Sequence, residues 1–101
     1  MAGVSKKSNK KIVKPGKEIV ESMVENFRDT LLKITRQEID ELTIDLKNVK
    51  DIDSTGLGLL IAAKNSFKQA GRQLNLKNVP ENIENLMQVL GLDGFFNLDS
   101  V

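Results

Sequence analysis

Apolar residues in this chain repeat with two different spacings that alternate along its length. Steps of three and four residues, which mark one face of a helix, run over about 18–36 and 55–70 and again after Pro80. Short runs of strand-forming residues separate these segments, at 11–14, 42–46, 73–77 and 95–98. Neighbouring strands that are separated by a whole helix must run parallel. The pattern therefore predicts an α/β fold: a small, mainly parallel or mixed sheet of about four strands, with three helices packed on it.

The periodicity also predicts which residues form the core. Gly71 and Gly91 follow the second and third helices, where a left-handed cap is needed, and Pro80 fits a first turn. Lys64 falls at the edge of the second face. The apolar positions expected to face the core are Ile19, Val20, Met23, Val24, Phe27, Leu31 and Ile34 in the first helix, Leu57, Leu60, Ile61 and Phe67 in the second, and Ile83, Leu86, Met87 and Leu90 in the third.

Charge divides the chain into a basic start and an acidic body. The first 17 residues hold six lysines and no acidic residue, whereas 18–101 hold nine basic and 14 acidic residues, a net charge of −5. Residues 1–9 have nothing to bury, so we expect a disordered basic tail there and a single domain over 10–101. We interpret the lysines as a solvated terminus rather than a contact for nucleic acid or an anionic membrane. No tyrosine or tryptophan accompanies them as a stacking platform.

Cysteine and histidine are both absent from the sequence. Their absence excludes disulfides, the usual zinc sites, Ser-His triads and Cys-His dyads. No apolar run approaches the roughly 20 residues of a membrane span, and the start lacks the apolar region of a secretory signal. We therefore expect a cytoplasmic protein that uses no cofactor and no metal.

The segment 51–60 joins a strand pattern to the second helix through small polar residues. Asp53, Ser54 and Thr55 are residue types that accept hydrogen bonds from the free N–H groups of a helix's first turn. A hydroxyl held there lies at the positive end of the helix dipole, with backbone donors nearby. Ser54 is therefore a candidate for carrying a phosphoryl group. The same residues also fit a plain helix cap.

Two other interpretations of these residues are less favoured. Gly56-Leu57-Gly58 does not continue into a dinucleotide fingerprint, because Ile61 occupies the third glycine position, and no Gly-Lys-Ser/Thr follows as in a phosphate loop. These glycines instead favour close packing of the helix. Asp45 and Asp53 have no further acid clearly converging on them, so solvated or capping carboxylates are favoured over an acid–base or magnesium pair.

The junction resembles the phosphorylatable loop of the STAS family, the bacterial anti-sigma-factor antagonists. The family motif Asp-Ser-Ser/Thr-Gly-Leu-Gly, at the head of the second helix, corresponds here to 53–58. The strand at 42–46, the segment 70–74, and Leu90-Gly91-Leu92 with Phe95-Phe96 are also similar, so the resemblance covers about 40–98. The start differs. Where the family has a longer hairpin and a Gly-x-Leu-Asp turn, this chain has Pro15-Gly16-Lys17-Glu18-Ile19.

The resemblance implies a regulatory binding module, not an enzyme. Antagonists of this family bind an anti-sigma factor that is also a serine kinase, and phosphorylation makes them release it. The implied partners are a serine-kinase anti-sigma factor or a related histidine-kinase-fold protein, together with a phosphatase. The implied phosphorylation site is Ser54, within a partner interface that buries Leu57; the implied contact residues are Asp53, Ser54, Thr55, Gly56 and Leu57.

Two alternatives remain open from the sequence. A STAS domain can act without phosphorylation, as an accessory component of a lipid-transport ATPase or as a scaffold in a stressosome-like assembly. A small phosphate- or nucleotide-binding enzyme built on the Ser54 helix start is less favoured, because the usual catalytic groups are missing.

Overall fold

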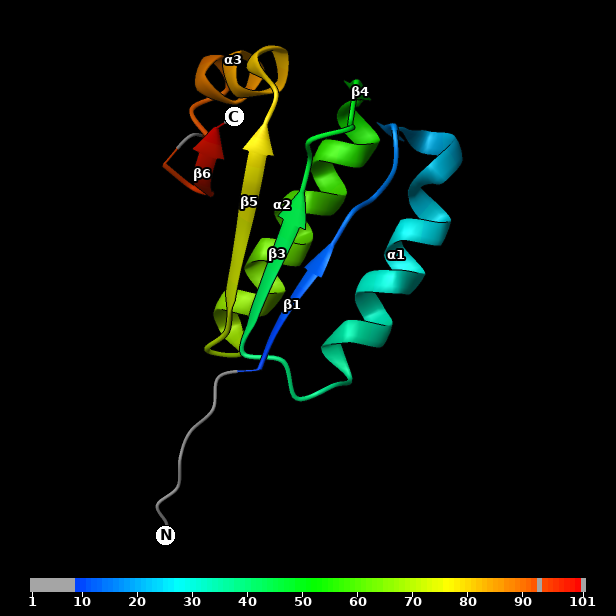
Figure 1. The fold of residues 1–101 in the computed structure, drawn as a ribbon, viewed down its shortest axis with the longest axis vertical. Coiled ribbons are helices and arrows are strands. Elements are labelled where there is room, and N and C mark those ends of the chain that lie inside the picture. Colours follow the sequence, from blue (N-terminus) through cyan, green and yellow to red (C-terminus); the bar gives the residue numbers. More distant parts are fainter. Residues whose placement is uncertain (1–8, 93, 101) are drawn as a thin grey trace, which may run out of the picture.

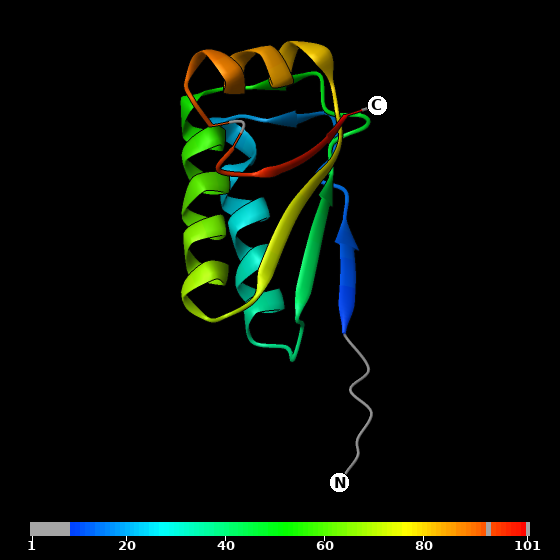
Figure 2. The ribbon, with the colours of Figure 1, turned by 90° about the vertical axis from the view of Figure 1, so that its left-hand side faces the viewer.

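Helices and strands form two layers in the computed structural model, which describes residues 9–92 and 94–100. Four strands make the main sheet in the order β1-β3-β5-β6. Helices α1 and α2 lie on one face of this sheet, and α3 lies across its carboxyl end (Figure 1, Figure 2). The elements of these layers are β1 (Lys10–Val13), α1 (Glu21–Thr35), β3 (Glu41–Asp45), α2 (Ser54–Gln69), β5 (Gln73–Val79), α3 (Glu81–Val89) and β6 (Asn97–Ser100).

Strands and helices alternate as the sequence pattern predicts. Each ladder of the main sheet is parallel, from β1 with β3 to β5 with β6. The α/β fold with three helices and four main strands is thereby confirmed. Two further strands, β2 (Glu18–Ile19) and β4 (Asp51–Ile52), form a separate parallel pair.

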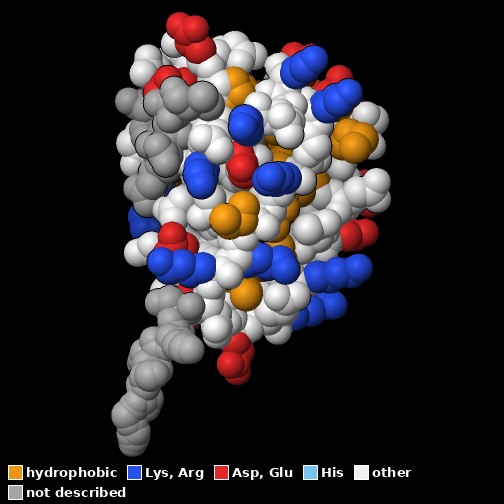
Figure 3. Space-filling model, viewed as in Figure 1, with side chains coloured by type: hydrophobic (Ala, Val, Ile, Leu, Met, Phe, Trp, Pro, Cys, Tyr) orange, Lys and Arg blue, Asp and Glu red, His pale blue; other side chains and the backbone are white. Residues whose placement is uncertain are grey.

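Residues of β3 and β5 alternate between the core and the opposite face of the sheet. Leu42 and Ile44 of β3 and Leu74 and Leu76 of β5 are completely buried, whereas Thr43 is only partly buried. Parallel sheets usually have both faces covered. Here the alternate positions are largely polar, which suits a face open to water. Figure 3 looks onto this face, where side chains of both charges surround small groups of hydrophobic ones.

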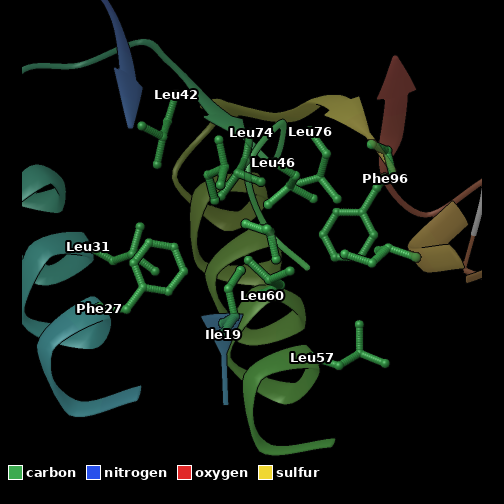
Figure 4. Packing of buried hydrophobic residues seen from close by; sticks show 14 of the residues in the cluster. Ile19, Phe27, Leu31, Leu42, Leu46, Leu57, Leu60, Leu74, Leu76 and Phe96 are labelled. Carbon is green, nitrogen blue, oxygen red and sulfur yellow. The ribbon is translucent and has the colours of Figure 1, made fainter. Parts of the chain in front are cut away.

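The core lies between the sheet and the helical layer. Figure 4 shows side chains of the helices and of the sheet pointing toward one another from both sides. Leucine-to-alanine changes at such sites cost about 2–5 kcal/mol. The buried cluster includes Ile19 from β2, Phe27, Leu31 and Ile34 from α1, Leu60 and Phe67 from α2, the four strand residues above, Ile83 and Met87 from α3, and Phe96.

The first helix begins later than predicted. Residues 18–36 were expected to be helical, but Glu18 and Ile19 are extended and Val20 is the residue before the helix, with φ −123° and ψ 171°. The prediction was wrong here because Ile19 pairs with Ile52, a contact that helical periodicity cannot reveal. The segment between β3 and Ser54 likewise contains a strand that was not predicted, β4.

The predicted face of the third helix is only half correct. Ile83 and Met87 are buried, but Leu86 is 37% exposed and Leu90 is 51% exposed. Because α3 crosses the end of the sheet instead of lying along its face, only one edge of its apolar stripe reaches the core (Figure 1). Met23, on α1, is similarly 39% exposed.

The predicted glycine caps are confirmed, and the last strand starts two residues later than expected. Gly71 and Gly91 have φ of +73° and +72°, the left-handed conformation that ends a helix. The final strand was predicted over 95–98, whereas Phe95 and Phe96 lie before β6 and contact each other edge to face, with ring centroids 5.0 Å apart.

The predicted disordered tail lies mostly outside the described residues, which begin at Asn9. Asn9 itself is held by hydrogen bonds to the segment before β3: its side-chain amide donates to the Glu38 carbonyl at 2.7 Å. Its backbone N–H also donates to the carboxylate of Asp40 at 3.2 Å. Within the described part of the chain, no helix has the length and apolar character needed to cross a membrane.

Candidate functional site

Asp53 connects the starts of two helices. One carboxylate oxygen accepts the backbone N–H of Gly56 at 2.8 Å, which caps α2. The other accepts the backbone N–H of Glu21, the first residue of α1, at 2.9 Å. The predicted capping role is therefore confirmed for α2. The bond to α1 was not predicted, because it joins residues 32 positions apart.

The hydrogen bonds also set the ionisation of Asp53. The backbone N–H of Gly56 lowers the pKa of this carboxyl most, and the N–H of Glu21 lowers it further. Both donors favour the charged form, so the carboxylate is ionised at neutral pH. A fixed negative charge therefore lies directly before Ser54.

The short sheet of β2 and β4 holds this junction together. Ile19 pairs with Ile52, and the backbone N–H of Asp53 donates to the Ile19 carbonyl at 3.3 Å. Lys50 donates its backbone N–H to the Lys17 carbonyl at 2.6 Å. Because β2 leads directly into α1 and β4 into α2, the pair fixes the two helix starts side by side.

Gly56 is required by this close approach. A Cβ at this position would overlap the carbonyl oxygen of Ile19, which is backbone and has little freedom to move. Gly58, by contrast, has nothing within 4 Å of such a Cβ. The prediction that the glycines allow close packing is thus confirmed for Gly56 and wrong for Gly58.

The five predicted contact residues divide into exposed and buried ones. Ser54 and Thr55 are exposed at the first turn of α2. Asp53 is partly buried and engaged in capping, and Gly56 is buried. Leu57 is 7% exposed and belongs to the core of the domain, so the expectation that a partner buries it is corrected: its own chain already does. The surface that this end offers a partner is therefore Ser54, Thr55 and their neighbours.

Acidic residues occur in the segments that meet at the start of α2. Glu18 and Asp51 are partners in the β2–β4 register, and both are exposed. Glu21 is the first residue of α1, and its backbone N–H donates to the carboxylate of Asp53. Lys50 is an exposed basic residue in the same segment. The short sheet and the two helix starts thus bring four acidic residues, Asp53 included, into the segments that meet at this junction.

Asp45 has a separate role at the end of β3. It is 9% exposed and accepts the backbone N–H of Lys47 at 3.0 Å and the side-chain amide of Asn78 at 3.1 Å. The Lys47 N–H is the main reason that the pKa of Asp45 is lowered, although burial acts in the opposite direction. Asp45 is therefore neither solvated nor a helix cap, the two roles that had been predicted, because it is buried and closes the turn after β3. Among the described residues, no group of three acidic, histidine or cysteine side chains could hold a metal ion.

The β2–β4 pair and the Glu21 bond were missed by sequence reasoning. The strands have two residues each, too few for an alternating pattern to be recognised. The available signal was Gly16, whose φ of +106° forms the turn that leads into β2. Gly16 lies in the segment 15–19, where the sequence differs from the Gly-x-Leu-Asp turn of the STAS family.

Comparisons with known proteins place the chain as a whole among its relatives. The family model described as "STAS domain" matches residues 3–101, a wider span than the 40–98 of the sequence resemblance. The anti-sigma-B factor antagonist of Bacillus subtilis (strain 168) is 33% identical over 74 residues, which cover 73% of this chain and 67% of that protein. The antagonist of the same name from Staphylococcus epidermidis is 28% identical over 87 residues, covering 86% of this chain and 81% of the relative.

Solved structures show the same fold in different settings. The anti-sigma factor antagonist SpoIIAA in its unphosphorylated form matches with a TM-score of 0.75 at 15% identity, over 95% of this chain and 85% of that chain. The phosphorylated form of the Bacillus protein SpoIIAA matches with 0.68 at 17% identity, over 88% and 81%. The murine anion transporter Slc26a9 matches with 0.77 at 19% identity, over 96% of this chain but 17% of the transporter. From the family model and the Bacillus subtilis relative, this chain belongs to the STAS domain family.

Proposed function

We propose that this protein is a cytoplasmic anti-sigma-factor antagonist whose binding is switched by phosphorylation of Ser54. The observation that carries the proposal is the exposed Ser54 hydroxyl at the Asp53-capped start of α2, within the STAS motif. Relatives covering most of the chain bear the name anti-sigma-B factor antagonist. The proposed partner is a serine-kinase anti-sigma factor or a related histidine-kinase-fold protein.

The proposed switch is electrostatic. Phosphorylation adds about −1.5 to −2 charges at neutral pH, next to the ionised Asp53 and the exposed Glu18, Glu21 and Asp51. In the free domain, the phosphate faces water and the positive end of the α2 dipole, so it is tolerated. In a desolvated interface the same charge is costly unless the partner supplies a cation. The modified protein therefore releases its partner without refolding.

The proposed role is binding, with the chemistry supplied by other proteins. The partner kinase transfers the phosphoryl group, and a phosphatase removes it to restore binding. This chain contributes an exposed hydroxyl nucleophile and a rigid junction that presents it.

A second candidate function is that of an accessory or scaffolding STAS domain that is not regulated by phosphorylation. The same fold occurs inside a much larger transporter chain, so the fold alone is compatible with an accessory or scaffolding module. Such a module binds a fixed partner whatever the state of Ser54. The two candidates therefore differ in a single measurable property, the dependence of binding on the charge at Ser54.

The test is phosphorylation followed by binding. The full chain is incubated with ATP and candidate anti-sigma-factor kinases, the anti-sigma-B factor among them, and the product is analysed by intact mass and site mapping. We expect one phosphate on Ser54, none on Ser54→Ala, and normal modification of the neighbouring control Thr55→Ala. A kinase that binds the domain tightly but modifies no residue, or modifies Thr55 instead, would rule out the proposed switch.

A further inference from the structure

An apolar groove runs between α1 and α2, on the helical layer. The two helices lie on the same side of the sheet (Figure 2). Between them is a cavity of about 200 Å³ that opens to solvent. Small residues on α2 leave this space, because Ala62 and Ser66 cannot fill the gap to Leu32 and Thr35 of α1. The groove is thus a consequence of side-chain size on two neighbouring helices.

The groove leaves apolar surface in water. Leu32 is 47% exposed, and Ala62 is exposed opposite it. Leu59 lines the same space from α2 and is only partly buried. Contiguous exposed apolar patches that are surrounded by polar residues often mark binding sites. Leu31 and Phe67 of the core form the floor of the groove, whereas Leu32 and Ala62 stand at its exposed edges.

Arg28 gives this groove a charge. It is the one charged residue among the described residues that line the cavity, and its side chain is exposed. Arg28 also makes no ion pair with any described residue. Among the described residues, the ion pair found is between Lys10 and Glu41. A free guanidinium beside an apolar groove favours a ligand that brings a carboxylate next to an apolar group.

We infer that this groove binds an amphipathic helix of a partner protein, with a large apolar side chain over Ala62 and a carboxylate at Arg28. A helix fits between two parallel neighbours by ridges-into-grooves packing, and its apolar face supplies the anchor. Ser66 lies in the lining as an exposed hydroxyl for the polar edge of that helix, whereas the Thr35 hydroxyl donates to the Leu32 carbonyl of α1 at 2.7 Å. The occupant is therefore an acidic amphipathic helix.

A second copy of this chain fits the groove less well. Symmetric pairing would bring the Arg28 side chains of both copies to one interface, and like charges repel there. The groove also lies apart from Ser54. Its nearest lining residue on α2, Leu59, is five residues along the helix, or about 8 Å at 1.5 Å per residue. Binding in the groove therefore does not depend on the proposed phosphorylation.

The probe is a pair of synthetic amphipathic helical peptides of about 18 residues, long enough to be marginally helical in water. Both carry leucine and phenylalanine on one face; one has glutamate beside that face, and the other has lysine. Titration of the isotope-labelled full chain, followed by NMR, should shift the amide signals of Leu32, Ala62 and Ser66. The glutamate peptide should bind about fivefold more tightly, the scale of one exposed ion pair.

Variants with matched controls test each part of the inference. Arg28→Glu should reverse the preference between the two peptides, while Lys33→Glu, an exposed change outside the groove lining, should keep it. Ala62→Trp should fill the groove and abolish binding, whereas Asn65→Trp, exposed elsewhere on α2, should not. Ser54→Asp should bind the peptide normally, which separates this result from the phosphorylation test.

Three outcomes would overturn the inference. One is the absence of groove shifts at millimolar peptide, and another is equal affinity for both peptides. The third is concentration-dependent self-association that Ala62→Trp abolishes, because the occupant would then be a second copy. The exposed Leu86, Val89 and Leu90 of α3 would be the apolar helix face offered in that case.

Discussion

The turn around Asp45 and the junction around Asp53 each place a carboxylate at the carboxyl end of a strand, where it accepts a backbone N–H. Asp45 bonds to Lys47, two residues further on, and to the side chain of Asn78. Asp53 bonds to Gly56 in its own helix and to Glu21 at the start of another. The first therefore closes a turn at the end of the sheet, while the second fixes two helices relative to each other.

The difference between the two carboxylates lies in their position, not in their ionisation. The pKa is lowered at both residues, and a backbone N–H is the largest cause in each case. Ionisation therefore does not distinguish them. What distinguishes Asp53 is its place beside an exposed hydroxyl, in a junction built from segments that are far apart in sequence. The following predictions test this comparison, from the largest expected effect to the smallest.

Gly56→Ala should have the largest effect, because it moves the donor that Asp53 needs. The new Cβ would collide with the Ile19 backbone, and overpacking of this kind costs about 3 kcal/mol or more when backbone must shift. Urea unfolding monitored by circular dichroism measures it. Gly58→Ala is the matched control, since the site is open and alanine in a helix gains about 1 kcal/mol over glycine. A Gly56→Ala variant as stable as the parent chain would mean that the junction can widen freely.

Alanine at the two carboxylates should separate their roles. Asp53→Ala removes acceptors from the starts of α1 and α2, so the melting temperature should fall by several degrees and the kinase should modify Ser54 more slowly. Asp45→Ala should also lower the melting temperature but leave the rate of Ser54 modification unchanged. Differential scanning calorimetry and a phosphorylation time course give both quantities. Equal slowing by the two variants would remove the distinction between them.

The pH dependence of stability should report both carboxylates. Because the folded pKa of each lies below its ordinary value of 3.8, their stabilisation is fully present above that value and is lost as pH falls through the folded pKa. The difference in melting temperature between the parent chain and Asp53→Ala should therefore shrink as pH falls from about 6 to about 3. A difference that stays constant over this range would mean that the charge of Asp53 does not contribute.

Ser54→Asp should have the smallest effect on folding. The residue is exposed at the first position of α2, where the helix dipole favours a negative charge by about 0.3–1 kcal/mol. Repulsion from Asp53 opposes this gain, so the melting temperature should change by only a few degrees while partner binding is lost. Lost binding in a folded variant supports the proposed switch. Unchanged binding would favour the scaffold role.

Local patterns in the sequence predicted the order of the elements, because each depends on a few neighbouring residues. The alternation of Leu42 and Ile44 in a strand and the glycine caps at Gly71 and Gly91 are examples. The cap at Asp53 was found in the same way. These features require no knowledge of how distant segments meet.

The parts that could not be predicted depend on contacts between distant segments. The bond from Glu21 to Asp53 needs β2 and β4 to pair first, and neither strand has a pattern of its own. The same holds for burial: Leu86 and Leu57 both lie on apolar helix faces, yet only Leu57 faces the core. Whether an apolar side chain is buried depends on how its helix is oriented relative to the sheet. The periodicity of apolar residues within one helix does not reveal that orientation.

The all-parallel main sheet has a consequence for the order in which the protein folds. Each described ladder joins strands on either side of a helix, as Thr43 does with Ile12 and with Asn75, so no neighbouring strands can zip together as a hairpin. Folds dominated by such non-local pairing fold slowly. A nascent chain that ends at Gln69 has β1 and β3 but lacks β5, the strand that joins β3 to β6. During synthesis one edge of β3 therefore stays unpaired until residues 73–79 have been made. Until then, this edge can pair with other chains.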